Sequence, residues 1–195
     1  MDGRPTSWSP DGKLLAFDKG PRGQSDLFLW PKPDGAAPTG PAARPFLQTQ
    51  HNELTAMFSP DGRWIAYTSS ESGQPQLYVR PAAPGAGGQW LISTSGGSGP
   101  RWASGGRELF YRAAGVKVNV VAIEPGATFL PGTPKELFTY SSYTSLSGVY
   151  DVSADGKRFL MITSGAAEQG ATATPEIHFV LEWFEDIRRR VRAGG

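Results

Sequence analysis

The chain has 195 residues, which is enough for one repeat domain with a sizeable core. Its formal net charge of +1 gives no electrostatic support for a nucleic-acid or membrane-surface partner, and the lack of cysteine excludes disulfides and thiolate metal sites. No apolar run approaches the length of a membrane span, and the first residues lack the charged-then-apolar pattern of a signal peptide. The 25 glycines and 17 prolines between short apolar runs predict an all-β fold.

The first predicted element is a hairpin at residues 8–17, where a Ser-Pro-Asp-Gly turn lies between an aromatic residue and an apolar strand. The same pattern returns at 58–67, and degenerate copies follow at 102–111 and 152–161. The glycines of successive copies are 50, 44 and 50 residues apart. A period of this size indicates a repeat architecture, here the blades of a β-propeller.

Each turn depends most on its glycine. In Ser-Pro-Asp-Gly the serine opens a type I turn, the proline presets φ at the second position, and the glycine takes the left-handed place that follows. Two copies lack the proline and the third also lacks the aspartate, but all keep the glycine, at Gly12, Gly62, Gly106 and Gly156. We infer that the turn needs a residue without Cβ.

A strand that is apolar on both faces follows each turn. The third place after the glycine holds Leu15, Ile65, Leu109 and Phe159, and the fifth holds Phe17, Tyr67, Tyr111 and Met161. The fourth place points to the other face and is also apolar, with Ala16, Ala66, Phe110 and Leu160. This pattern predicts burial on both faces, as in a blade between two neighbouring blades.

We expect one propeller segment over residues 1–195, with blades at about 5–47, 54–93, 99–138 and 148–183. The expected strands are 6–8, 13–17, 26–30 and 44–47, then 54–58, 63–69, 76–80 and 89–93, then 100–102, 108–112, 116–123 and 135–138, and finally 149–152, 158–163 and 177–183. Residues 184–195 form a C-terminal tail with a short predicted helix.

The predicted ring is incomplete. The fourth blade is one strand short, and nothing before Thr6 is long enough to supply the missing strand. We therefore expect about four blades, the last incomplete, from a larger ring of six to eight blades. The chain is then the C-terminal part of a longer propeller, or it covers its open edges by association, self-association included, because unpaired edge strands are a liability.

The Ser-Pro-Asp-Gly-basic-apolar copies resemble the WD40-like (PD40) repeats of TolB-type β-propellers, without the Gly-His and Trp-Asp signatures of true WD40 repeats. A narrower resemblance covers 107–111, 133–138, 150–156 and 180–186, which are similar to the closing blades of a propeller at the C-terminal end of certain bacterial serine/threonine protein kinases. That resemblance implies a parent protein with an N-terminal kinase, a membrane span and an extracytoplasmic or periplasmic propeller. The sequence contains no Gly-rich kinase loop and no His-Arg-Asp or Asp-Phe-Gly motif, so we assign no kinase activity to this chain.

Residues that would support a metal or nucleophile are sparse. His51 and His178 have no further ligand at metal-binding spacing, so we interpret both as ordinary surface or strand histidines. The run 96–100, Gly-Gly-Ser-Gly-Pro, nearly imitates a nucleophile elbow around Ser98, but proline replaces the closing glycine and a turn is expected instead.

Repeated aspartates and aromatics have structural interpretations. Asp11, Asp61 and Asp155 lack a second carboxylate two residues away, so turn geometry explains them better than calcium does. The aromatics before the turns, Trp8, Phe58 and Trp102, are expected to pack between blades. Trp30, Trp64 and Trp90 fall in another phase, so partly exposed contact anchors stay an alternative for them, with packing as the simpler interpretation. Arg188, Arg189 and Arg190 are interpreted as a solvated helix end rather than a nucleic-acid patch.

We therefore expect a non-catalytic binding, sensor or protein-interaction module that uses no catalytic residue, metal or cofactor. Its loops and central surface would bind a protein or small ligand, and the chain itself is not expected to span a membrane. Two alternatives stay open: the propeller of a prolyl-oligopeptidase-type peptidase, which gates substrate to a hydrolase, and a TolB-like periplasmic partner protein. Fold-level analogy alone does not separate them.

Overall fold

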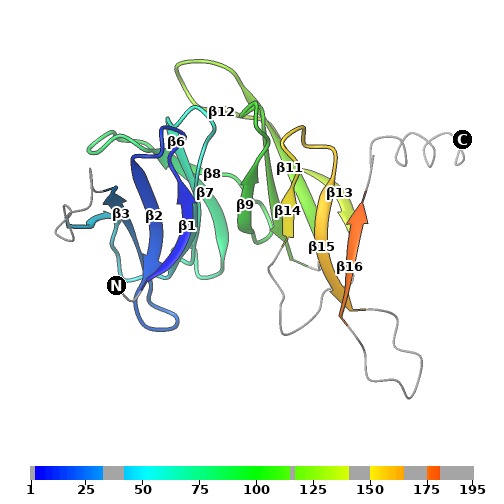
Figure 1. The fold of residues 1–195 in the computed structure, drawn as a ribbon, viewed down its shortest axis with the longest axis horizontal. Helices are drawn as coiled ribbons and strands as arrows, with labels where there is room; N and C mark the ends of the chain where they lie inside the picture. Colours follow the sequence, from blue (N-terminus) through cyan, green and yellow to red (C-terminus); the bar gives the residue numbers. More distant parts are fainter. Residues whose placement is uncertain (1–2, 33–41, 115–116, 141–149, 165–174, 181–195) are drawn as a thin grey trace, which may run out of the picture.

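Four antiparallel sheets follow one another along the chain (Figure 1). The computed structural model describes residues 3–32, 42–114, 117–140, 150–164 and 175–180, and at 162–164 and 175–180 it describes the backbone alone. Within these ranges every regular element is a β-strand. The described part of the chain holds no helix with the length and apolarity that a membrane crossing needs.

The first, second and fourth sheets are meanders whose strands pair in chain order, and the third departs from this order only at β13. The first sheet consists of β1 (Arg4–Trp8), β2 (Leu14–Lys19), β3 (Asp26–Pro31) and β4 (Arg44–Leu47), and the second of β5 (Glu53–Phe58), β6 (Trp64–Ser69), β7 (Gln76–Pro81) and β8 (Trp90–Leu91). The third consists of β9 (Ser98–Trp102), β10 (Glu108–Ala113), β11 (Lys117–Glu124), β12 (Leu130–Pro131) and β13 (Lys135–Thr139), where β12 and β13 both pair with β11. The fourth consists of β14 (Tyr150–Val152), β15 (Phe159–Ser164) and β16 (Pro175–Val180).

The sheets pack face to face around their first strands. Strand β5 contacts β1 on one side and β9 on the other, and β9 in turn contacts β14. We call β1, β5, β9 and β14 the inner strands. The β1–β2 turn and its counterparts lie at one end of the sheets, the turn end, and the connections from β4 to β5 and from β8 to β9 lie at the opposite end, the crossover end (Figure 1). This arrangement is that of a partial β-propeller, which confirms the predicted fold class.

Three apolar cores lie between successive sheets, and the repeat determines which residue enters which core. Ile65 and Tyr67 face the first sheet, whereas Ala66 between them faces the third. In the same way Leu109 and Tyr111 face the second sheet, whereas Phe110, like Phe159 and Met161 of β15, lies in the core between the third and fourth sheets. The places three and five after the turn glycine thus face the preceding sheet, and the fourth place faces the following sheet.

Burial on both faces is confirmed for the two middle sheets, whereas in each outer sheet one of the three residues departs from it. Every one of the six apolar residues at these places in β6 and β10 has zero exposed area. Leu15, however, is only half-buried, and 40% of Leu160 is exposed. Leu15 faces away from the second sheet and Leu160 away from the third, so neither has a described sheet to cover it.

The predicted turns are confirmed in detail. In the first turn the Ser9 hydroxyl donates to Asp11 Oδ1 at 2.6 Å and accepts the Leu14 N–H at 2.9 Å, while the Gly12 N–H donates to the Ser9 carbonyl at 2.8 Å. The second turn repeats these bonds with Ser59 and Asp61, and the fourth with Ser153 and Asp155. The aspartates therefore form the hydrogen bonds of their own turns.

The third turn shows what the loss of proline allows. Ser104 occupies the place that Pro10 and Pro60 hold in the first two copies, and a proline has no N–H to donate. The Ser104 N–H donates to the Ala154 carbonyl of the fourth turn at 2.9 Å. The degenerate copy thus gains a backbone bond between the third and fourth sheets.

The other strand predictions hold to within a few residues, with three differences. The expected strand 89–93 shortens to β8, and β12 was not predicted. Trp8 does not pack between blades as expected: 49% of it is exposed, because no sheet among the described residues covers its side of the first sheet. The expected tail and helix at 184–195 lie outside the described residues.

The turn glycines give a direct test of the repeat geometry. Gly62 has φ +71°, and a Cβ built on it would lie 3.4 Å from Cδ of Pro10 in the preceding turn. We expect Gly62→Ala to lower the free energy of unfolding by about 1–2 kcal/mol, because an L-residue is strained in the left-handed region. Gly105→Ala in the third turn is the matched control, since nothing lies within 4 Å of its built Cβ, and it should stay within about 0.5 kcal/mol of wild type in urea unfolding. Equal losses for the two variants would contradict this account.

Candidate functional site

Polar side chains recur at one repeat position beside the inner strands. The sixth residue after the turn glycine is Asp18, Thr68 and Arg112 in the first three copies, although the third to fifth residues are apolar. Each of these side chains bonds to a residue near the start of its own inner strand, namely Arg4, Thr55 and Ser98 respectively. The three sheets therefore place polar pairs at the crossover half of the inner strands, and only the member six places after the turn glycine keeps the same repeat position.

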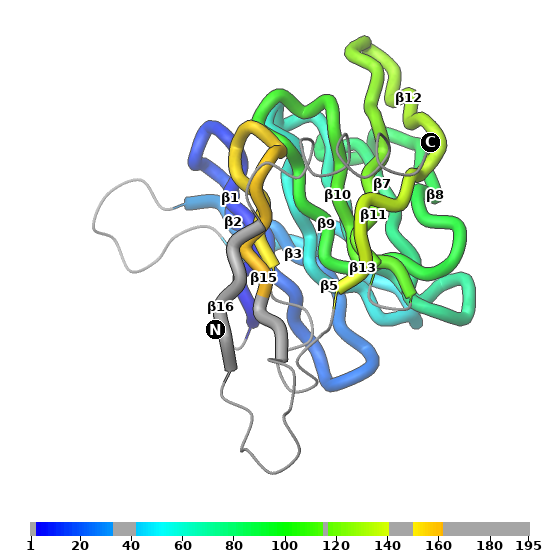
Figure 2. The backbone as a smooth tube through the Cα atoms, turned by 90° about the vertical axis from the view of Figure 1, so that its right-hand side faces the viewer, coloured from blue at the N-terminus to red at the C-terminus, as the bar shows by residue number. Residues whose placement is uncertain are grey.

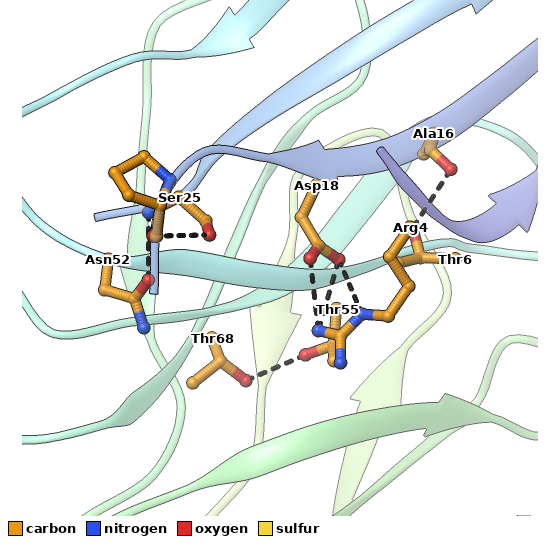
Figure 3. Close-up of polar contacts among 9 residues, drawn as sticks. Arg4, Thr6, Ala16, Asp18, Ser25, Asn52, Thr55 and Thr68 are labelled. Carbon is orange, nitrogen blue, oxygen red and sulfur yellow. Dashed lines mark hydrogen bonds and ion pairs between the residues drawn. The ribbon is translucent and has the colours of Figure 1, made fainter. Parts of the chain in front are cut away.

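The first of these pairs is ionic. Arg4 Nη2 lies 3.1 Å from Asp18 Oδ2 and 3.3 Å from Oδ1, and Arg4 Nε lies 3.4 Å from Oδ1 (Figure 3). The Asp18 side chain is only 7% exposed, whereas that of Arg4 is 62% exposed. A nearly buried carboxylate is thus neutralised by a guanidinium whose outer surface remains open to a partner.

The second pair contains the one strained residue that is not glycine among those described. Thr55 has φ +56°, and its hydroxyl lies 3.0 Å from the hydroxyl of Thr68 (Figure 3). The equivalent residue of β9 is Gly99, with φ +62°, which tolerates this conformation without strain. A β-branched residue with positive φ is a genuine outlier, and such strain often accompanies function.

The third pair adjoins a second set of charges. Arg112 Nη2 donates to Ser98 Oγ at 3.1 Å. On the same inner strand Arg101 Nε lies 3.4 Å from Asp151 Oδ1 of β14, and the Arg101 guanidinium lies 5.4 Å from the centre of the Tyr150 ring. Asp151 is well exposed, at 71% of its side chain, so this pair also presents charge to the solvent. We call these side chains the inner-strand cluster, made up of Arg4, Asp18, Thr55, Thr68, Ser98, Arg101, Arg112 and Asp151.

A second polar network joins the first two sheets at the crossover end. The Ser25 N–H donates to Asn52 Oδ1 at 3.0 Å (Figure 3). The Glu53 N–H donates to the Ser25 carbonyl at 2.7 Å. The Thr49 hydroxyl donates to Glu53 Oε1 at 2.6 Å, but Oε2 is buried without a partner. The connection between the sheets is therefore held by specific bonds around a fully buried carboxyl.

Burial sets the electrostatics of this junction. Desolvation raises the pKa of the Glu53 carboxyl above its ordinary value of 4.5, and the Asp26 carboxylate adds to the increase, while the Thr49 hydrogen bond opposes it. Burial likewise raises the pKa of the Tyr67 phenol, whose hydroxyl has no hydrogen-bond partner. The equivalent Tyr111 hydroxyl accepts a bond from Asn119 Nδ2 at 3.2 Å.

The turn end carries a groove between the first two sheets. It has a volume of about 540 Å³ and is lined by Pro10, Asp11, Phe58 and Asp61, with Arg44 and Arg63 among the other lining residues. Its carboxylates accept bonds within their own turns, and Arg63 Nε donates to Asp61 Oδ2 at 2.6 Å. The two carboxylates of this groove thus form the hydrogen bonds of the repeated turns and have a structural explanation.

The residues singled out in the sequence are spread over the fold. His51 lies in the connection between the first two sheets, and its backbone N–H donates to Thr49 Oγ1 at 2.9 Å. His178 lies on β16 of the fourth sheet. Ser98 begins β9 and pairs with Arg112 instead of standing on a strand-to-helix elbow. In the described ranges no three His, Cys, Asp or Glu side chains gather as a metal site requires.

The aromatics divide as their position in the repeat dictates. Phe58 is buried, and the Trp102 indole N–H donates to the Met57 carbonyl of the preceding sheet at 3.2 Å. Trp30, Trp64 and Trp90 are half-buried, so each is packed on one side and partly exposed on the other. Trp64 and Trp90 each pack 5.2 Å from the ring of Phe129, a core residue that the sequence analysis did not single out. Arg188, Arg189 and Arg190 lie outside the described residues.

The inner-strand cluster was also missed, although the sequence carries a signal for it. A polar residue recurs six places after each of the first three turn glycines, directly after three apolar residues. The signal is weak because the residue type changes from Asp18 to Thr68 to Arg112. Chemically the cluster offers hydrogen bonds and both signs of charge, and it holds no paired nucleophile and base.

No protein-family model matches the chain, and no curated protein matches it. Among solved structures it is similar to TolB from Acinetobacter baumannii, at 19% identity and a TM-score of 0.61, covering 91% of this chain and 40% of that one. It is also similar to a nidogen/laminin complex (13%, TM-score 0.58, covering 86% and 57%) and to a Mycobacterium tuberculosis puromycin-hydrolyzing peptidase (14%, TM-score 0.56, covering 94% and 29%). These likenesses support the TolB-like, WD40-like propeller fold, and the chain spans less than two thirds of each of these structures.

The unpartnered Tyr67 hydroxyl makes a paired prediction. We expect Tyr67→Phe to raise the free energy of unfolding by about 1 kcal/mol, because it removes a buried hydroxyl that has no hydrogen bond. Tyr111→Phe should lower it by about 1 kcal/mol, because Asn119 then loses its acceptor. Urea unfolding measures both values, and a loss of stability in Tyr67→Phe would show that its hydroxyl is satisfied in solution.

The Glu53 carboxyl predicts a pH dependence. Because its pKa is raised in the folded state, wild-type stability falls as the pH rises above 4.5 through the folded-state pKa. Glu53→Gln removes this ionisable group and with it the loss of stability at higher pH. The free energy of unfolding of the variant, relative to wild type, should therefore be higher at pH 7 than at pH 4.

Glu136 gives the control of opposite sign. The Lys117 hydrogen bond, 2.7 Å long, lowers the pKa of Glu136, so its contribution is present above 4.5 and is lost as the pH falls. Glu136→Gln should lose stability relative to wild type at pH 7 and lose less at pH 4. Parallel pH profiles for the two variants would contradict both assignments.

Proposed function

We propose that this chain is a non-catalytic interaction module that binds a partner protein against its inner-strand cluster. The observation that carries the proposal is the strained Thr55, held with positive φ at the place where the next sheet uses Gly99. A strained backbone conformation beside exposed charges is typical of a surface selected for contact rather than for stability.

The charges of the cluster define the partner's chemistry. Arg4 is 62% exposed at its side chain and Asp151 is 71% exposed, and each is already paired within the chain. A partner surface with both signs of charge can bond to these groups without burying an unpaired one. With a net charge of +1, the chain lacks the strong positive potential that a nucleic-acid partner would require.

The similar structures support an interaction role by analogy only. They include TolB and a nidogen/laminin complex, and fold-level likeness does not transfer a partner. By the narrower sequence resemblance we propose that the parent protein is a bacterial serine/threonine kinase whose C-terminal, extracytoplasmic propeller acts as a sensor. A TolB-like periplasmic partner protein is the alternative that shares this interaction role.

A peptidase accessory is a second candidate. The tricorn protease and the puromycin-hydrolyzing peptidase cover 93% and 94% of this chain, at TM-scores of 0.58 and 0.56. In that case the propeller would gate substrates to a hydrolase. The gene that encodes the chain separates the candidates: an upstream kinase, a downstream α/β-hydrolase, or a signal peptide with neither.

The binding surface is tested with charge-matched variants. The immobilised chain is incubated with an extract of its source cells, and retained proteins are identified by mass spectrometry for wild type, Arg101→Glu and Lys13→Glu. We expect Arg101→Glu to lose the partner, because the new carboxylate repels Asp151 and reverses the charge at this position of the inner-strand cluster. Lys13→Glu makes the same change of charge at the turn end, beside Asp11, and should retain the partner. Equal loss in both variants, or no protein retained above a blank support, would overturn the proposal.

A further inference from the structure

The three interfaces between sheets are copies of one another, and each has two unlike halves. One half consists of the third and fifth places after the turn glycine and faces the preceding sheet. The other half is the fourth place and faces the following sheet. In the interface between the first and second sheets, for example, Ile65 belongs to the first half and Ala16 to the second, and both have zero exposed area.

The first sheet presents the first half of this interface without a neighbour. On its outer face Trp8, Leu15 and Trp30 lie side by side in register across β1, β2 and β3. Trp8 is 49% exposed, and Leu15 and Trp30 are half-buried, whereas Phe17 at the fifth place is only 3% exposed because it packs against Phe28 within its own sheet. The open part of this face is therefore the row of Trp8, Leu15 and Trp30. The equivalents of Trp8 and Leu15 in the second sheet, Phe58 and Ile65, are 6% and 0% exposed because the first sheet covers them.

The surroundings of the turn glycines also show that no described turn lies beside the first turn. A Cβ built on Gly62 would lie 3.4 Å from Pro10, and one built on Gly106 would lie 3.6 Å from Pro60, so each glycine lies against the preceding turn. A Cβ built on Gly12 would meet nothing within 4 Å. The first turn therefore has open space where the other two hold a proline.

The fourth sheet presents the complementary half. Leu160 occupies the place of Ala16, Ala66 and Phe110, which all have zero exposed area, yet 40% of Leu160 is exposed. Among the described side chains it is the member of this row that no following sheet covers. The chain thus carries both unlike halves of its own repeated interface. They belong to the two end sheets of the row (Figure 1), and in Figure 2 the row is seen from the fourth-sheet side, with β15 in front of β1 and β2.

We propose that these faces bind each other between two copies of the chain, with the fourth sheet of one copy covering the first sheet of the other. Ala154, which holds the proline place in the fourth turn, then lies against Gly12 of the second copy. Unlike halves give a head-to-tail interface, which closes into a ring when the rotation between copies permits. Two copies supply eight sheets. This inference is independent of the proposed partner at the inner-strand cluster.

The mass of the chain in solution tests the proposal. Light scattering after size-exclusion chromatography should give twice the chain mass of 20.9 kDa for wild type. Trp8→Asp and Leu160→Asp each charge one half of the interface, and each should raise the dissociation constant about 30-fold or more. Leu91→Asp, at a 54% exposed position on β8, is the control and should keep the wild-type mass.

A mixture of the two variants shows whether unlike faces bind each other, first sheet to fourth sheet, or like faces bind each other. The Trp8→Asp copy keeps an intact fourth sheet and the Leu160→Asp copy keeps an intact first sheet, so the mixture should form a one-to-one dimer that neither forms alone. Trp8→Ser and Leu160→Ser replace them if circular dichroism shows that either aspartate variant is unfolded. A monomeric wild type, as expected if further blades of a longer polypeptide cover these faces, would overturn the proposal. Dimers that persist in either single variant would also overturn it.

Discussion

The structure depends on burial of apolar rows between neighbouring sheets. A single sheet such as β5–β8 has apolar side chains on both faces and cannot bury them by itself, so its stability comes from the sheets on either side. This requirement explains the repeat: the turn glycine sets the register, and the register assigns Ile65 and Tyr67 to one neighbour and Ala66 to the other. Each buried Leu, Ile or Phe contributes about 1.5–3 kcal/mol, so the interfaces outweigh any single hydrogen bond.

Polar groups specify the arrangement that burial stabilises. The Ser104–Ala154 bond joins adjacent turns, and Asn52 joins the first two sheets at the opposite end. Between these ends the inner strands carry pairs such as Arg4 and Asp18. The inner edge is where successive sheets meet most closely, which is why a partner that binds there contacts several sheets at once.

The repeat made the fold predictable, because four copies of one motif report the same hairpin and the same two-faced strand. The predicted burial of Trp8 and Leu160 is wrong, because a residue on the face of a sheet is buried only if a neighbouring sheet covers that face. The residue type alone does not show whether such a sheet is present. The candidate site was harder to predict. Positive φ at Thr55 follows from a local irregularity in the β5–β6 pairing, and nothing in its sequence neighbourhood distinguishes it from an ordinary strand threonine.

The most direct measurement of the central claim is native-state amide hydrogen exchange, read strand by strand in the wild-type chain under conditions where it is monomeric. Burial by two neighbours should give the amides of β6 and β10 the greatest protection, with lower protection in β2 and β15, each of which has one neighbouring sheet. Equal protection in all four strands, or greater protection in β2 than in β6, would show that stability does not come from the interfaces between sheets.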